Sequence, residues 1–228
     1  MAPKLVRLES APDLVDQVYR SLLDAISEGA LAPGQRITQE DIAEQLAVSR
    51  QPVLQALRLL KKDGFVQDAP GRGLLVAPLD ATWTLNVYQV RGALDALAAR
   101  LAAQQRFQLD PKLIEQGRKA ARGRNVKAMI DADAAFHDAI YAASGNPLIE
   151  QSAHQHWGHL RRVMGAVLQQ SRQREPVWDE HEAIAEAVAA GDADTAAWLM
   201  QEHARQAAHN LAQHLPDLVN PSPSVQTR

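Results

Sequence analysis

The sequence predicts a mostly α-helical chain, with an N-terminal winged helix-turn-helix that carries a small β-hairpin wing and an all-α helical bundle after it. Of the 228 residues, 46% are hydrophobic and only 4% aromatic, a composition that favours helices over a β-sandwich. Strand-like runs occur only near residues 65–77, and the pattern from residue 80 onward is helical throughout. We therefore expect a first domain over 1–78, a second over 79–215 and a flexible tail over 216–228.

The N-terminal domain begins with an amphipathic segment at 13–28 that ends at Gly29. A Pro-Gly turn follows, and Thr38 then has the chemistry of an N-cap for a short helix at 38–46. After a short connection a third helix starts, for which Ser49 is the expected cap. Two β-type runs, FVQDA and GLLVA, flank a Pro-Gly-Arg-Gly turn, which is the pattern of a hairpin.

The second domain reads as a bundle whose helices are separated by proline and glycine breaks. The expected helices cover 80–107, 111–122, 125–144, 147–171, 176–190 and 192–215.

Composition also limits the class of protein. The chain has no cysteine, which excludes disulfides and thiolate metal sites. The N-terminus lacks the apolar core of a signal peptide, and no apolar run is long enough to span a bilayer. We expect a cytoplasmic protein with no membrane partner. The net charge of −3 gives no hint of a polyanionic partner, so an expectation of DNA binding depends on motif alone.

Polar side chains at the start of the third helix suit base recognition. Arg50 can make two hydrogen bonds to guanine, and Gln51 can do the same to adenine. Gln55 lies one turn further on, and Arg58 and Lys61 have the reach for phosphates. Taken alone, such residues are more often an ordinary solvated helix start; the order helix, turn, helix and wing favours a DNA-binding face.

This part of the chain resembles the winged-helix domain of the GntR family of transcription regulators, over about residues 10–78. The family usually carries Val-Ser-Arg-Thr-Pro-Val-Arg-Glu-Ala-Leu where this chain reads VSRQPVLQAL from Val48 to Leu57. Leu54 therefore replaces an arginine that commonly contacts DNA in the family, and we expect Gln51 and Gln55 to compensate. The resemblance also implies that Arg72 in the wing lies close to DNA.

The bundle contains one group of residues suited to a metal ion. Asp133 and His137 are four residues apart and so share one helix face. With His181 and His203 they would give three imidazoles and one carboxylate, a set suited to Zn²⁺, Ni²⁺, Mn²⁺ or Fe²⁺. A lone Asp-x-x-x-His is more often a surface ion pair or a core histidine, and with eight histidines some pairs are suggestive by chance.

Residues 80–215 resemble the ligand-sensing (FCD) domain of the FadR-type branch of the same family, through VRGALDALAARLAA, DAAFHDAIYAASGNPLI, DEHEAIAEAVAAGDADTA and the helix that carries His203. Many members hold a metal with an aspartate and three histidines, which implies one divalent ion per chain at Asp133, His137, His181 and His203. The resemblance implies a carboxylate effector beside the metal and near Arg91, and one of Arg161 and Arg162 is a further candidate.

The sequence thus favours a metabolite-responsive transcription regulator, a repressor by the commoner family behaviour, that binds a palindromic operator in double-stranded DNA as a homodimer. One alternative is the same regulator without a metal, sensing an acyl-CoA-like ligand. A remote one is a metal-dependent enzyme, but no separate base or nucleophile stands at motif spacing, so we expect no enzyme.

Overall fold

The computed structural model describes residues 14–170 and 175–219, and its contacts divide the chain into two compact units. The division falls between Ala77 and Pro78, with the short segment Ser27–Ala30 grouped with the second unit. Within the described residues, no helix is both long and apolar enough to cross a membrane.

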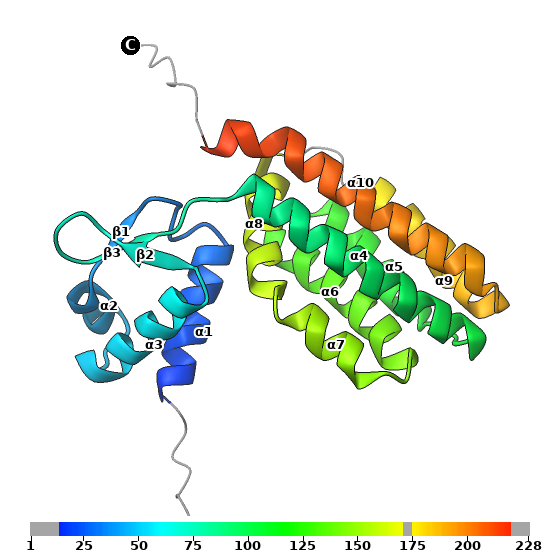
Figure 1. Ribbon diagram of the computed structural model, residues 1–228, viewed down its shortest axis with the longest axis horizontal. Helices are drawn as coiled ribbons and strands as arrows, with labels where there is room; N and C mark the ends of the chain where they lie inside the picture. The colour runs from blue at the N-terminus through cyan, green and yellow to red at the C-terminus, as the bar shows by residue number, and fades with distance from the viewer. Residues whose placement is uncertain (1–13, 171–174, 220–228) are drawn as a thin grey trace, which may run out of the picture. The chain divides into compact units, whose positions relative to one another are not determined.

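The first unit packs three helices, α1 (Leu14–Ser27), α2 (Gln39–Gln45) and α3 (Arg50–Lys62), around one apolar core (Figure 1). Each helix contributes the inward stripe that its spacing predicts. The most deeply buried members of this core are Ile26, Val53, Ala56, Leu60 and Val76.

The turn between α2 and α3 fixes the helix-turn-helix. Thr38 caps α2 by accepting a hydrogen bond from the Asp41 amide at 3.2 Å, as its sequence position predicts. Ala47 takes the left-handed conformation (φ 52°), which helps the chain change direction within the four residues between α2 and α3. Ser49 occupies the N-cap of α3 without a side-chain bond. One reason is that Pro52, the third residue of the helix, has no amide hydrogen to donate to a cap.

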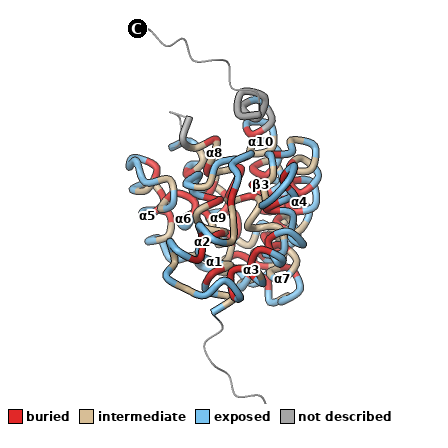
Figure 2. Tube along the Cα trace, turned by 90° about the vertical axis from the view of Figure 1, so that its left-hand side faces the viewer, coloured by how far each residue is buried: buried red, intermediate tan, exposed pale blue. Residues whose placement is uncertain are grey.

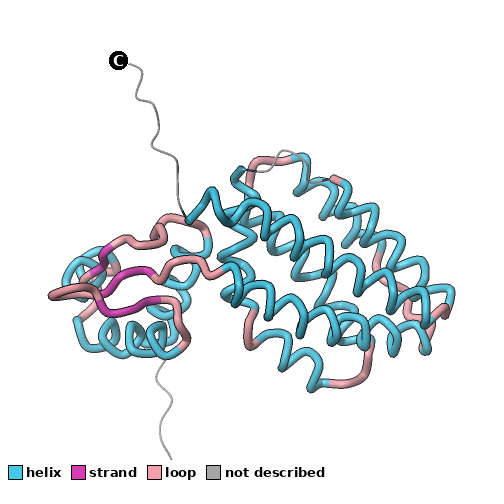
Figure 3. The backbone as a smooth tube through the Cα atoms, turned by 45° about the horizontal axis from the view of Figure 1, so that its top comes forward, coloured by secondary structure: helices cyan, strands magenta, loops and turns pink. Residues whose placement is uncertain are grey.

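The sheet has three antiparallel strands in the order β1-β3-β2 (magenta in Figure 3). The expected hairpin is present as β2 (Val66–Asp68) and β3 (Leu74–Val76). The additional strand β1 (Arg36–Ile37) was not predicted, because two residues are too few to show an alternating pattern. It pairs with β3, which joins the hairpin to the segment before α2.

The second unit is a bundle of helices, and its buried residues are among those drawn red in Figure 2. Its longest helices, α4 and α10, pack along each other (Figure 1). The helices are α4 (Ala81–Gln104), α5 (Pro111–Arg122), α6 (Val126–Ala143), α7 (Pro147–His154), α8 (Trp157–Gln170), α9 (Pro176–Ala190) and α10 (Ala193–Val219).

Two helix boundaries differ from the sequence prediction. The expected single helix at 147–171 is two helices, broken at Gln155 and His156. The break lets α7 bury Ile149 and Ala153 in one apolar cluster while α8 buries its own stripe in another, which a continuous helix would not allow. At the other end, α10 continues through Pro216 to Val219; the rest of the expected tail, 220–228, lies outside the described residues.

Candidate metal centre, ligand cavity and DNA-binding face

Four side chains of the kinds that bind metals converge inside the bundle from three separate helices. Asp133 and His137 project from α6, His181 from α9 and His203 from α10. One ligand atom from each lies within 4.8 Å of the others, and the three imidazoles are buried. Within the described residues this is the only group of three or more such side chains gathered in this way. The structure thus brings together all four residues that the sequence singled out.

The distances fit a shared cation. His181 Nε2 lies 3.3 Å from His203 Nε2 and 3.6 Å from Asp133 Oδ1, and His137 Nε2 lies 4.0 Å from Asp133 Oδ2. Because zinc holds imidazole nitrogen at about 2.0–2.1 Å, ligand atoms around one ion lie at most about 4.2 Å apart. The donor set therefore has nearly the spacing that a transition metal requires.

Burial keeps two of the imidazoles in the form that binds metals. Desolvation lowers the pKa of His137 and of His181 well below the ordinary histidine value, and the nearby Arg91 charge lowers both further. Both side chains are therefore neutral at pH 7 and offer a lone pair. Burial raises the pKa of Asp133, an effect that the Arg91 charge opposes.

Neighbouring groups hold the imidazole rings in place. The Glu180 carboxylate lies 2.7 Å from His203 Nδ1, so the opposite ring nitrogen points to the centre. The His181 ring stacks on Phe136 with 4.1 Å between ring centroids and meets the edge of Trp178. Its Nδ1 is buried and makes no hydrogen bond with any described residue. On the Nδ1 side, packing rather than a polar partner therefore orients His181, whereas its Nε2 contacts His203 at 3.3 Å.

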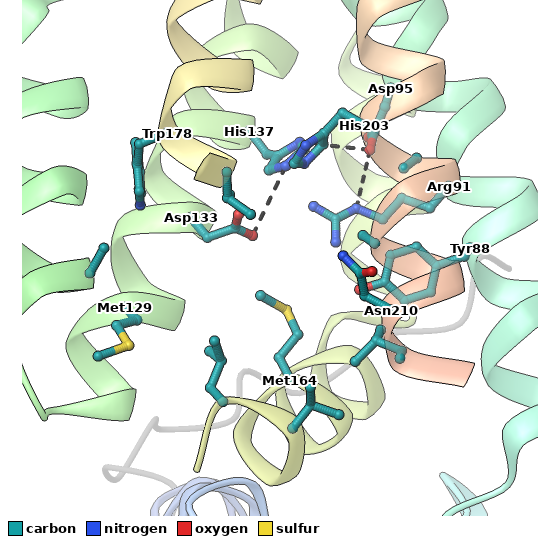
Figure 4. A pocket seen from close by; sticks show the side chains of 17 residues that line it. Tyr88, Arg91, Asp95, Met129, Asp133, His137, Met164, Trp178, His203 and Asn210 are labelled. Carbon is teal, nitrogen blue, oxygen red and sulfur yellow. Dashed lines mark ion pairs between the residues drawn. The ribbon is translucent and has the colours of Figure 1, made fainter. Parts of the chain in front are cut away.

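A cavity of about 160 Å³ opens beside this cluster (Figure 4). Arg91 of α4 lines it and is itself only 6% exposed. Its Nε lies 3.3 Å from Asp95 Oδ2, and its guanidinium lies 5.0 Å from the centre of the Trp157 ring. Apolar side chains such as Met129 and Met164 form much of the remaining wall, with Tyr88 and Asn210 as further polar groups.

The other two predicted effector residues, Arg161 and Arg162, lie on α8 and not on α4. Arg161 faces Asp131 at 3.6 Å and keeps 17% of its side chain exposed. Arg162 is buried. Neither is among the residues that line the cavity, whereas Arg91 is.

Sequence reasoning missed several members of the site, among them Asp95, Glu180 and Trp178. A weak signal existed for two of them, since Asp95 follows Arg91 by one helical turn and Glu180 directly precedes His181. Nothing in the sequence pointed to Trp178, which reaches the cavity from the first turn of α9.

The first unit presents a polar face on α3. Arg50, Gln51, Gln55 and Arg58 are all exposed, while the opposite face of the helix is buried in the core. Gln51, Gln55 and Arg58 follow one another at spacings of four and three and so share one side of the helix. Arg50 Nη1 lies 3.2 Å from Glu40 Oε1 of α2, and the Arg50 carbonyl accepts a hydrogen bond from Gln39. Leu54 is partly buried beside this side.

The wing is held by Arg36, which sequence reasoning did not select. Its guanidinium donates to the carbonyls of Arg72 and Pro70, each at 2.7 Å. Gly73, at φ 89°, leaves room for the Ile37 carbonyl, which would lie 2.9 Å from an added Cβ. The exposed Arg72 side chain therefore sits at the tip of a turn whose backbone is fixed from within.

A helix-turn-helix with a wing, joined to a helical bundle, is an arrangement that defines a class of DNA-binding transcription regulators. Residues 14–76 match the bacterial regulatory proteins of the gntR family, and residues 86–206 match the FCD domain. The chain belongs to the GntR family of DNA-binding transcription regulators and carries an FCD domain.

Individual relatives agree with this assignment. Over 209 residues the chain is 29% identical to an uncharacterized HTH-type transcriptional regulator in an unstable DNA locus of Streptomyces ambofaciens, covering 88% of this chain and 87% of that protein. The fold is similar to that of E. coli McbR/YncC, with a TM-score of 0.74, 24% identity and coverage of 91% of this chain and 99% of that one. A GntR transcriptional regulator from Rhodococcus sp. RHA1 gives a TM-score of 0.70 at 24% identity, with 86% and 96% covered. The Streptomyces and Rhodococcus proteins are named as transcriptional regulators, as is E. coli McbR, and none of the three is named as an enzyme, in line with the sequence expectation.

Proposed function

We propose that this regulator controls its operator affinity through a small carboxylate metabolite that binds beside a divalent transition metal in the helical unit. The observation that carries the proposal is the convergence of Asp133, His137, His181 and His203 at the wall of a cavity that also contains Arg91. One ion of Zn²⁺, Ni²⁺, Mn²⁺ or Fe²⁺ per chain would be held by these four side chains. When bound, the metal supplies a Lewis-acidic position for an anionic ligand.

Charge supports a carboxylate as the effector. Two of the imidazoles are neutral, and Asp133 supplies one negative charge to the ligand set. The Arg91 cation is balanced by Asp95, at 3.3 Å. With Asp133 as its one anionic ligand, a divalent ion would keep one positive charge within the ligand set, and a small anion bound to the metal would neutralise it. Arg91 offers planar donors suited to a carboxylate.

The DNA side of the proposal rests on the exposed face of α3 and on the wing. In this proposal Arg50, Gln51 and Gln55, which are exposed on α3, read bases, and the exposed Arg58 and Arg72 contact the backbone or the minor groove. A homodimer would place two such helices on a palindromic operator in the cytoplasm. The effector would act as an inducer of a repressor, by binding one arrangement of the dimer more tightly than the other.

Elemental analysis of untagged protein tests the metal directly. We expect about one equivalent of transition metal per chain in the wild type and strong loss in His203→Ala. His154→Ala is the matched control, because His154 is a half-exposed histidine paired with Asp138 outside the cluster. Less than about 0.2 equivalents in the wild type, with no thermal shift on adding Zn²⁺, Ni²⁺ or Mn²⁺, would contradict the metal site and favour a metal-free regulator of an acyl-CoA-like ligand.

A gel-shift titration with citrate as the probe carboxylate tests regulation. Citrate should weaken operator binding by metal-loaded wild type and have much less effect on His181→Ala, whose basal operator affinity should be intact because His181 lies outside the DNA-binding unit. Equal sensitivity of the two proteins would exclude the metal from the response.

A further inference from the structure

The buried carboxylate of Asp95 lies between the metal cluster and the cavity arginine. Asp95 is 1% exposed on α4. Its Oδ2 lies 3.3 Å from Arg91 Nε and 3.6 Å from His137 Nδ1, and its Oδ1 accepts a hydrogen bond from the Tyr141 hydroxyl. Figure 4 shows the dashed contacts from Arg91 and from His137 meeting at this side chain.

We propose that Asp95 is a positioning residue that orients the metal ligand His137 and the cavity arginine Arg91 through one shared carboxylate oxygen. The effect of Asp95 on metal affinity rests on the proposed function. The effect of Asp95 on which nitrogen of His137 carries the proton does not.

The orientation of His137 by Asp95 follows from imidazole chemistry. A neutral imidazole carries its proton on one nitrogen and a lone pair on the other. No described residue forms a hydrogen bond with His137 Nδ1, and the carboxylate that faces it is that of Asp95. An acceptor on this side keeps the proton on Nδ1 and leaves the Nε2 lone pair for the cluster.

Asp95 differs in this respect from Glu180, the other carboxylate behind a ligand histidine. Glu180 is 30% exposed, and among the described residues its close partner is His203 alone. Asp95 is fully enclosed and serves two partners with one oxygen. A carboxylate ligand that draws the Arg91 guanidinium toward itself would release Oδ2 for His137, so ligand binding and metal binding would strengthen each other.

Long-range ¹H–¹⁵N NMR of the histidine rings tests the inference in the full-length, metal-free chain at pH 8. We expect His137 of the wild type to carry its proton on Nδ1. In Asp95→Asn the Tyr141 hydroxyl still needs an acceptor, so the new amide NH₂ faces His137, and the proton should move to Nε2. Asp138→Asn is the matched control, since Asp138 lies on the same helix as His137 and pairs with exposed His154 at 2.8 Å; it should leave the His137 ring unchanged. An Nε2 proton on His137 in the wild type would overturn the proposal, and this measurement needs no variant to fold.

Zinc affinity, measured by competition with a chelator, provides a second readout. Asp95→Asn should bind Zn²⁺ roughly 10- to 100-fold more weakly, as outer partners of ligand histidines do, while Asp138→Asn should match the wild type. Glu180→Gln should also lose affinity but leave the His137 ring signals in place. Wild-type affinity in a folded Asp95→Asn would overturn the proposal. If the wild type itself bound no zinc, the proposed function would fail. The NMR measurement of the protonated nitrogen of His137 would still test the role of Asp95.

A double-mutant cycle with Arg91→Gln tests the shared oxygen. Because Arg91 and His137 use the same atom, the two substitutions should change the logarithm of zinc affinity non-additively. Additive effects would overturn the shared-oxygen bridge.

Discussion

Arg50 is the first residue of α3, and its exposed guanidinium is available to a base edge. We expect Arg50→Ala to weaken specific operator binding by about 1–3 kcal/mol per half-site, the value of one bidentate base contact. The fold should be unaffected, since the side chain is 67% exposed and its ion pair with Glu40 contributes little. Gel-shift titration with matched circular dichroism measures both. Arg122→Ala, which removes an equally exposed arginine from the helical unit, is the charge control. Unchanged operator affinity in Arg50→Ala would contradict the base contact that we propose for Arg50.

Leu54 stands on α3 where family members commonly carry an arginine, and it is partly buried beside the polar side. We expect Leu54→Arg to raise general DNA affinity and to steepen its dependence on salt by about one counterion per contact. Affinity for an unrelated duplex at several salt concentrations measures the slope. A slope equal to that of the wild type would place residue 54 away from the phosphate backbone.

His181 is fully buried, and burial lowers its pKa well below that of the unfolded chain. As pH falls below about 6.5, the unfolded state binds the proton first, so the metal-free wild type loses stability. His181→Leu removes this term. The unfolding free energy of the variant minus that of the wild type should therefore rise as pH falls, by up to about 1.4 kcal/mol per pH unit. Denaturant unfolding in chelator at pH 7.5 and 5.5 measures this difference. For Ile184→Val, a buried change on the same helix without a titrating group, the difference should not vary with pH.

At the scale of elements, α5 and α9 approach each other through a glycine. A Cβ on Gly117 would lie 2.0 Å from the Trp178 ring, and that ring is buried against His181. We expect Gly117→Ala to destabilise the protein by about 1–3 kcal/mol through overpacking, against a helix-propensity gain of about 1 kcal/mol. The exposed neighbour Gln116→Ala should be nearly neutral. Urea unfolding compares the two, and a stabilised Gly117→Ala would show that Trp178 can move aside.

Across the whole molecule, the four candidate metal ligands come from three helices that are far apart in sequence. An ion bound at a hundredfold excess over its dissociation constant would add about 2.7 kcal/mol to the stability of the folded state. Chelation should therefore lower the melting temperature by roughly 5–10 °C. His203→Ala, which lacks one ligand, should melt at the same temperature with and without chelator. A wild type that is insensitive to chelation in differential scanning calorimetry would contradict a metal that holds these helices together.

Most of the secondary structure of this protein could be predicted from local sequence patterns. Periodicity located the helices, and glycine and proline located most of their ends, because apolar spacing and backbone conformation act within a few residues. The sequence also singled out the four side chains that cluster in the bundle, through a family resemblance that supplied the long-range pairing of His181 and His203 with Asp133 and His137. Spacing alone could not have joined residues from three helices.

Only the tertiary structure decided which side chains face one another across elements. It placed Asp95 of α4 between Arg91 and His137, set Glu180 behind His203, and put Arg91, but neither Arg161 nor Arg162, in the cavity wall. It also paired β1 with β3 and broke the expected long helix into α7 and α8 so that each could bury its own apolar stripe. These outcomes depend on helix packing and on the burial of charges beside their partners. Both are properties of three-dimensional contacts between distant segments, which local sequence patterns do not encode.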